Sequence, residues 1–249
     1  MGKIYITSDN SISPDYITRV ASLTGGTVVD DPPAGSLYLR LGVDGISLNC
    51  DTLSYMGDYS GEIKRLRHNN LSHELLIKAA KLKNREPGEK ITIMDATAGM
   101  GEDSLLLAAA GYEIYLYEYN PVIFLMLEDT LRRASEVPEL KEIVSRMHVF
   151  HENSIDVMKS KVNIPNIVLL DPMFPQRQKS GLIKKKFQLI QKLETPCEDG
   201  EDMLKAAIDM NPDKVIVKRP ANGENLGNIK PDYTITGNSI RYDCYTIFK

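Results

Sequence analysis

The residues best suited to chemistry fall in two short segments, each of which follows an apolar run. The first reads DATAGMGED and spans residues 95 to 103, and the second reads DPMFP and begins at Asp171. Glycines such as Gly99 and Gly101, placed between an apolar run and a helix, let backbone amides approach a ligand. An acid followed by proline and an aromatic residue offers hydrogen-bond acceptors beside a stacking face. The two segments therefore predict a cofactor loop and a reacting turn.

The glycine loop has the surroundings of a nucleoside-binding site, although it lacks a dinucleotide fingerprint. That fingerprint needs a third glycine at position 104, where Ser104 stands. The next apolar run, EIYLYE, ends at Glu118, where a carboxylate can accept hydrogen bonds from both ribose hydroxyls. Asp95, at the end of the preceding run, would face a positive charge on the cofactor. The alternative is that these acids are only polar strand ends.

A third apolar run, MHVFHE, is followed by two short polar side chains. Asn153 and Ser154 lie where the adenine of a nucleoside would be held. The same residue types also cap helices, so a purely structural role is the alternative for both.

The reacting turn ends the run NIVLLDPMFP and resembles the acid-Pro-Pro-aromatic signature of methyltransferases that act on exocyclic amines. Such an amine is a poor nucleophile because its lone pair is delocalised into the ring. Hydrogen bonds to the Asp171 carboxylate and to the Pro172 carbonyl would localise the pair, and Phe174 would stack on the base. A structural Asp-Pro turn with a core phenylalanine is the alternative.

Short apolar runs alternate with helical stretches from Ile91 to the C-terminus, which predicts an α/β fold with a mostly parallel, doubly wound sheet. The last two runs, YTITG and RYDCYTIF, are too close for a parallel crossover, so they should form an antiparallel hairpin that places an antiparallel strand at one edge. This Rossmann-like arrangement is typical of class I methyltransferases.

The first part of the chain predicts a smaller α/β module. Ser13 and Pro14 begin a helix that ends at Gly25, and residues 37 to 41 and 46 to 50 form a hairpin. We expect a module with a basic connector over residues 1 to 69 and a cofactor-binding domain over residues 70 to 249. Ser72 is expected to cap a helix that continues to Leu82.

DATAGMGED, the Glu118-Tyr119-Asn120-Pro121 segment, DPMFPQRQKSGLIKKK and VIVKRP together resemble the RsmJ family of bacterial methyltransferases. That family methylates the N2 amine of a guanine in small-subunit ribosomal RNA, with S-adenosylmethionine as cofactor. The resemblance covers residues 91 to 249 best. It implies cofactor contacts at the following residues: Glu102, Asp103, Glu118, Tyr119, Asn153, Ser154 and Asp171. At Glu102 and Tyr119 the family commonly has arginine.

Basic residues follow the reacting turn and end a later apolar run, so a phosphate backbone could lie beside a flipped base. The candidate RNA contacts are Arg177, Lys179, Lys184, Lys185, Lys218 and Arg219. A solvated basic surface is the alternative, and the net charge of -4 means that RNA binding would need such a local patch.

Composition limits the remaining classes. Hydrophobic residues make up 42% of the 249-residue chain and charged residues 26%, as in a globular protein. Three scattered cysteines and four histidines lack metal-ligand spacing, so we expect no metal. We find no signal peptide and no apolar run long enough to span a membrane, and we expect a cytoplasmic protein. The oligomeric state is left open.

Other functions compete with methylation of ribosomal RNA. Methyltransferases that act on DNA adenine or on a protein glutamine also use an acid-Pro-x-aromatic turn. A nicotinamide-dependent oxidoreductase would need the third glycine and has no use for the reacting turn. A non-catalytic RNA-assembly factor that binds the cofactor would not need an intact turn.

Overall fold

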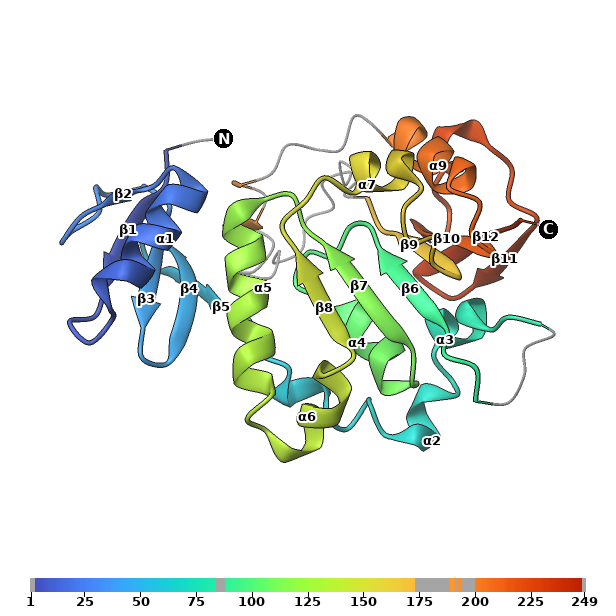
Figure 1. Cartoon of the computed structure of the whole chain (residues 1–249), viewed down its shortest axis with the longest axis horizontal. Coiled ribbons are helices and arrows are strands. Elements are labelled where there is room, and N and C mark those ends of the chain that lie inside the picture. Colours follow the sequence, from blue (N-terminus) through green and yellow to red (C-terminus); the bar gives the residue numbers. More distant parts are fainter. Residues whose placement is uncertain (1–2, 84–87, 173–188, 191, 194–199, 248–249) are drawn as a thin grey trace.

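The computed structural model describes residues 3–83, 88–172, 189–190, 192–193 and 200–247. Two β-sheets are built from these residues, and a long helix stands between them (Figure 1). The larger sheet contains seven strands in the order β11-β12-β10-β9-β6-β7-β8. Its strands are β6 (Thr92–Asp95), β7 (Glu113–Tyr117), β8 (Met147–Phe150), β9 (Ile167–Leu170), β10 (Lys214–Pro220), β11 (Tyr233–Thr236) and β12 (Ile240–Thr246).

The five strands from β8 across to β10 are parallel, which confirms the predicted α/β sheet. β9 is buried along its whole length because helices cover both faces of the sheet. The first three of these strands follow one another outward from β6 to β8, and the chain then returns to add β9 on the other side of β6. The sheet therefore has a topological switch point between β6 and β9.

The terminal hairpin is confirmed, and it forms an antiparallel pair at one edge of the sheet. β12 pairs antiparallel with β10 on one side and with β11 on the other, so β11 is the edge strand. The short turn between β11 and β12 requires the chain to reverse, but it does not determine which of the two strands pairs with β10.

Helices cover the seven-stranded sheet on both faces. α3 (Leu75–Ala80), α4 (Glu102–Ala109) and α6 (Pro138–Val144) share one core with residues such as Ile93 and Leu169 of the sheet. α7 (Ser154–Ser160) and α9 (Gly200–Asp209) share another with residues such as Val168 and Val217 on the opposite face. This is the layering of a doubly wound α/β domain.

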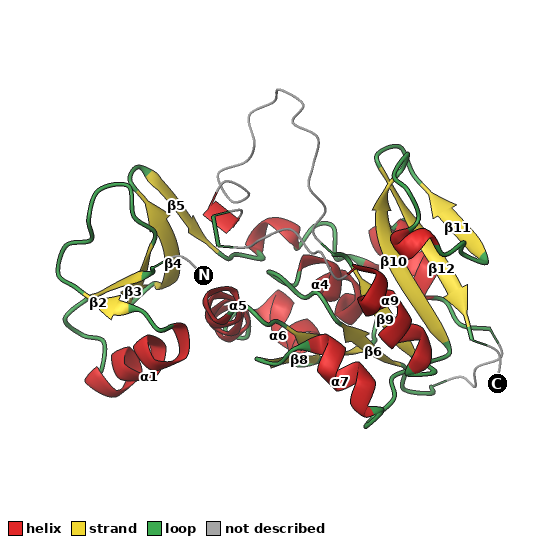
Figure 2. Ribbon diagram, turned by 90° about the horizontal axis from the view of Figure 1, so that it is seen from above, coloured by secondary structure: helices red, strands yellow, loops and turns green. Residues whose placement is uncertain are grey.

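The smaller sheet has the strand order β2-β1-β3-β4-β5. It contains β1 (Tyr5–Ser8), β2 (Thr27–Val28), β3 (Tyr38–Gly42), β4 (Gly45–Cys50) and β5 (Leu53–Met56). α1 (Pro14–Thr24) begins after the N-cap Ser13 and ends before Gly25, and β3 and β4 form a hairpin, both as predicted. Figure 2 shows α1 and α5 (Pro121–Ala134) beside this sheet. Their apolar side chains share a core with its inward-facing residues.

α5 belongs to both cores and therefore joins the two sheets. Val122 and Leu125 pack in the core of the smaller sheet, while Leu127 and Leu131 pack in that of the larger one. A polar contact reinforces the junction: Asp129 accepts hydrogen bonds from the backbone amide of Ile46 at 2.9 Å and from Nε of Arg133 at 2.8 Å. The carboxylate is therefore buried with donors from both parts of the chain.

The connector between the two sheets differs from its prediction. It contains the short helices η1 (Ser60–Glu62) and α2 (His68–Leu71), with Ser72 at the end of α2. The next helix, α3, begins after Glu74 and ends at Ala80, so Leu82 lies outside it.

In the part of the chain that the structure describes, no helix is long and apolar enough to cross a membrane.

We predict that Asp129→Ala lowers the free energy of unfolding by about 3 kcal/mol, because it leaves the buried Ile46 amide and the partly buried Arg133 guanidinium without their shared carboxylate acceptor. Denaturant unfolding measures this loss. Glu128→Ala is the matched control on the same helix, because its partner Arg19 is half exposed, and it should cost less than about 1 kcal/mol. Equal losses in the two variants would contradict a special role for Asp129.

Candidate active site

The switch point brings two acids together from segments far apart in the chain. Asp95 ends β6 in register with Leu169 of β9, and Asp171 follows the end of β9. In open α/β sheets, ligands bind beyond the carboxyl ends of the strands at such a point. Both predicted chemical segments therefore lie at the same edge of the sheet.

Asp95 is the buried acid of this site. Its carboxylate accepts hydrogen bonds from the Ser104 hydroxyl at 2.6 Å and from the Thr97 backbone amide at 3.1 Å. Burial raises the pKa of Asp95 to about 6; the two hydrogen bonds oppose the rise, and the nearby Asp103 and Asp171 carboxylates add to it. Asp95 is therefore an acid that an approaching positive charge would keep ionised.

The glycine loop lies between β6 and α4. Gly99 and Gly101 both have positive φ values, 53° and 71°, which favour glycine. Glu118 holds the loop, because its carboxylate accepts hydrogen bonds from the Gly99 amide at 3.0 Å and from the Asn120 amide at 2.7 Å. The loop and the carboxylate proposed for the ribose are therefore one hydrogen-bonded unit.

The smaller sheet leads into a tyrosine that supports the same loop. The hydroxyl of Tyr59 donates a hydrogen bond to the Met100 carbonyl at 2.7 Å, and its side chain is buried. A Cβ at Gly101 would lie 2.7 Å from that hydroxyl oxygen, so only glycine fits there without displacing the ring. The connector thus helps to shape the cofactor loop.

Asp171 is attached to the cofactor loop through its backbone. Its amide donates a hydrogen bond to the Thr97 hydroxyl at 2.7 Å, and the following Pro172 is buried. The Asp171 side chain is 41% exposed, so its carboxylate is accessible to a substrate. Desolvation by the surrounding protein raises the pKa of this carboxyl, and the Lys218 ammonium opposes the rise.

Lys218 lies inside the site, between two of its acids. Its ammonium lies 2.6 Å from a carboxylate oxygen of Asp103 and 2.9 Å from one of Asp171. Burial lowers the pKa of Lys218, but the two carboxylates more than offset this and hold it above its usual range. A phosphate contact needs an accessible cation, whereas this lysine already has two carboxylate partners.

The other predicted cofactor contacts lie around the same edge of the sheet. Glu102 is exposed in the first turn of α4, and the Tyr119 side chain is exposed directly after Glu118. Asn153 caps α7 by accepting a hydrogen bond from the Ile155 amide at 2.9 Å, and Ser154 is buried. The helix cap therefore accounts for the Asn153 oxygen, and a cofactor contact for this residue stays a prediction.

Several predicted residues lie outside the described part of the chain: Phe174, Arg177, Lys179, Lys184 and Lys185. Arg219 is described and is buried, with Nε donating a hydrogen bond to the Glu224 carbonyl at 2.8 Å. Like Lys218, it differs from the accessible cation that a phosphate contact requires.

The sequence analysis did not identify three residues that shape the site: Tyr59, Thr97 and Ser104. It named Lys218 but did not foresee its contacts with acids. Thr97 and Ser104 lie in or beside the glycine motif, where small hydroxyl residues next to a buried acid are a usable signal. Tyr59 carries no such signal, because its contact depends on how the connector folds back.

In the described ranges, no group of His, Cys, Asp and Glu residues is arranged to hold a metal ion.

The described residues fit a nucleoside cofactor that carries positive charge. Space around Gly99 is open, since a Cβ built there would have no atom closer than 4.0 Å. Glu118 lies at the strand end beside that glycine with a carboxylate suited to ribose hydroxyls, and Asp95 and Asp171 supply negative charge near the same loop.

A protein-family model described as "Putative SAM-dependent methyltransferase" matches residues 46–247. A protein named Ribosomal RNA small subunit methyltransferase J from Pseudomonas savastanoi is 38% identical over 167 residues, which are 67% of this chain and 62% of that protein. The protein of the same name from Pseudomonas paraeruginosa is 40% identical over 167 residues, which are 64% of that protein. The match thus spans less than two thirds of the length of these relatives.

The fold is also similar to the crystal structure of a SAM-dependent methyltransferase from Neisseria gonorrhoeae. The TM-score is 0.78 and the sequence identity 28%, with 98% of this chain and 96% of that one covered. The similarity therefore includes the smaller sheet as well as the larger one.

We predict that Asp95→Asn changes the pH dependence of stability. The folded state holds the Asp95 proton up to about pH 6, whereas an unfolded aspartate releases it near 3.8, so the stabilisation from this group is present below pH 4 and is lost as the pH rises through 6. Between pH 4 and pH 6, the free energy of unfolding of the variant should rise by roughly 2 to 3 kcal/mol relative to that of the parent. Denaturant unfolding at several pH values measures the difference, and a difference independent of pH would contradict the assignment.

Proposed function

Because this chain belongs to the family of SAM-dependent methyltransferases, we propose that it transfers a methyl group from S-adenosylmethionine to the exocyclic N2 amine of a guanine in small-subunit ribosomal RNA. The single observation that carries the reaction type is the attachment of Asp171 to the cofactor loop through Thr97. This contact keeps an acid-Pro turn beside a loop suited to a nucleoside. The choice of ribosomal RNA is supported by the names of the curated relatives.

In this proposal, Glu118 accepts hydrogen bonds from the ribose and the amides near Gly99 and Gly101 line the cofactor. Glu102, Asp103, Tyr119, Asn153 and Ser154 are further proposed contacts. Asp95, whose pKa is raised to about 6, is kept ionised by positive charge that binds nearby. When bound, the cofactor would supply an electrophilic methyl group on a sulfonium.

The reacting turn is proposed to prepare the amine. The Asp171 carboxylate accepts one N–H and the Pro172 carbonyl accepts the other, which localises the nitrogen lone pair and directs it at the methyl group. Phe174 is proposed to stack on the guanine. An amine that accepts a methyl group becomes cationic and would then release its proton to solvent, so the negative charge of Asp171 would stabilise the transition state.

We also propose a division at residue 69, with residues 1–69 as a supporting module of the methyltransferase domain. The Tyr59 contact with the cofactor loop supports a direct role for this module in shaping the site. Arg177, Lys179, Lys184 and Lys185 are proposed to contact the RNA backbone. The site of action would be the cytoplasm, where small subunits assemble.

We predict that Glu118→Ala weakens binding of S-adenosylmethionine by about 1 to 3 kcal/mol, because a charged acceptor for the ribose and the anchor of the Gly99 amide are both lost. Calorimetry measures the affinity. Glu113→Ala is the matched control at the other end of β7, where the acid pairs with His148 away from the loop. Unchanged affinity for Glu118→Ala would remove this residue from the cofactor site.

We predict that Asp171→Ala reduces single-turnover methyl transfer by about 100-fold or more, because it removes an acceptor that acts mainly in the transition state. Asp171→Asn should retain more activity, since the amide oxygen still accepts one hydrogen bond. The substrate is small ribosomal subunits from a strain that lacks this protein, with labelled S-adenosylmethionine at saturation, followed by mapping of the modified base.

Label on an N2 amine of guanine with the parent protein supports the substrate, and label on another base or on protein contradicts it. A near-normal rate for Asp171→Ala would move the chemistry away from this turn. Affinity for the cofactor is measured for each variant, so that weaker binding is separated from slower transfer.

A further inference from the structure

Lys218 connects two structural elements that the proposed reaction must keep aligned. Asp103 lies in the first turn of α4, directly after the cofactor loop, and Asp171 follows β9. The ammonium of Lys218 on β10 contacts both carboxylates, at 2.6 Å and 2.9 Å. The side chains of Lys218 and Asp103 are only 23% and 19% exposed, so solvent screens the contact between them weakly.

Lys218 is surrounded by acidic groups for which it is a counter-ion. Asp95 on β6 adds a third carboxylate near Asp171, and Tyr242 on β12 lies opposite Lys218 in the strand pairing. Arg219 also affects Asp171, but its Nε is engaged with the Glu224 carbonyl. Among the described residues, Lys218 is the cation in direct contact with both Asp103 and Asp171.

We propose that Lys218 is a positioning residue: its ammonium ties Asp103 to Asp171 and holds the Asp171 carboxylate toward the cofactor loop. This proposal rests on the methyl-transfer function for its kinetic readout, but its binding readout needs only the cofactor. It replaces the phosphate contact that the sequence suggested for this lysine with a role inside the site.

The charge balance explains why an ammonium is needed at this place. Asp103 and Asp171 are close neighbours because they share one ammonium, and without that cation the Asp171 carboxyl would take up a proton at a higher pH. A protonated Asp171 would accept a hydrogen bond from the amine less strongly and would no longer attract a sulfonium. Lys218 therefore helps Asp171 to stay negatively charged beside Asp103.

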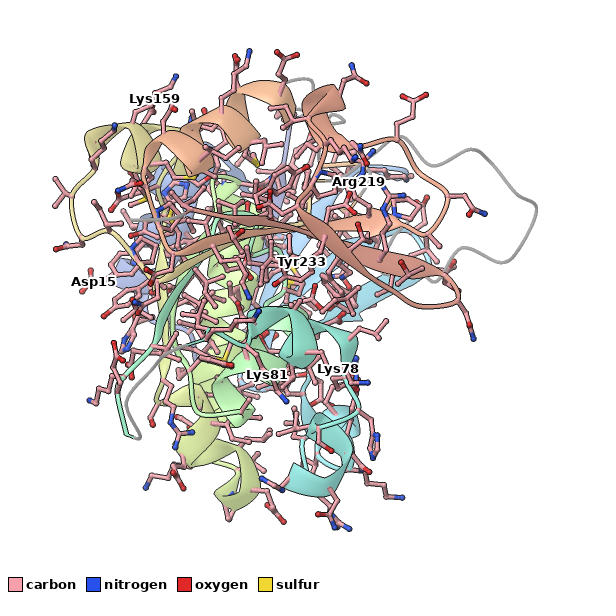
Figure 3. All side chains as sticks on the ribbon, turned by 90° about the vertical axis from the view of Figure 1, so that its right-hand side faces the viewer. Asp15, Lys78, Lys81, Lys159, Arg219 and Tyr233 are labelled. Carbon is pink, nitrogen blue, oxygen red and sulfur yellow. The ribbon has the colours of Figure 1, made fainter. Side chains whose placement is uncertain are left out.

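Lys214 on the same strand provides a matched control. Lys214 and Lys218 lie on the same face of β10, but the Lys214 ammonium donates hydrogen bonds to the backbone carbonyls of Ala79 at 2.8 Å and Lys81 at 2.5 Å. Figure 3 shows Lys81 well separated from Arg219, the neighbour of Lys218 in the chain. A substitution at Lys214 therefore removes a buried lysine from β10 without touching the acids of the site.

The test measures binding of S-adenosylmethionine and of S-adenosylhomocysteine, which lacks the sulfonium charge, by calorimetry from pH 5 to pH 9. For Lys218→Met, we expect the pH at which affinity for S-adenosylmethionine falls to move up by about one unit or more. Lys218→Arg should restore the parent profile, because a guanidinium can donate to both carboxylates. Lys214→Met should lower stability but leave the profile in place, and S-adenosylhomocysteine should show a smaller shift.

A folded Lys218→Met protein with the parent pH profile would overturn the proposal. If that variant does not fold, Asp103→Asn provides the test, because it leaves the Lys218 ammonium to Asp171 alone. The pH at which affinity for S-adenosylmethionine falls should then move down. An unchanged pH would overturn the proposal. In single turnover, Lys218→Met should lower the maximal rate while half-saturation by RNA stays unchanged. If the parent protein does not methylate RNA, the proposed substrate is contradicted. The pH shift in cofactor binding by Lys218→Met would still support this role of Lys218.

Discussion

The adjacency of β6 and β9 is the constraint on which the rest of the site depends. These strands are distant in the chain, yet their carboxyl ends lie side by side, so the acid that ends one and the acid that follows the other are brought close together. Like charges at such a place are unfavourable unless hydrogen bonds or a cation compensate them. The hydroxyl of Ser104 compensates Asp95, and the ammonium of Lys218 compensates Asp171. The positions of α4 and β10 follow from this requirement as much as from apolar packing.

The cofactor loop depends on glycine and is held from several directions. Positive φ angles at Gly99 and Gly101 give the loop its shape, and neighbouring elements fix it. Glu118 binds the loop from β7, and Tyr59 binds it from the connector. The connector that follows the smaller sheet therefore also supports the cofactor loop.

Much of the fold could be predicted from the sequence, because strands buried on both faces and helix-capping residues leave local patterns. Ser13 and Gly25 marked the ends of α1, and the short gap before β12 required a hairpin. Local patterns could not show that β12 would lie between β10 and β11, because strand order depends on contacts distant in sequence. For the same reason the sequence suggested a phosphate for Lys218 and not the two acids that it contacts: its strand end is visible in the sequence, while those acids come from α4 and the end of β9.

The double packing of α5 has a consequence for synthesis. A chain made from its N-terminus completes β1 to β5 well before α5 has emerged, and α1 alone then covers the apolar face of the smaller sheet. Ile46 also lacks the Asp129 acceptor for its backbone amide until that helix is present. We therefore expect the smaller sheet to become stable only after α5 has been translated, so that β1 to β5 stay accessible to chaperones and proteases until that point of synthesis.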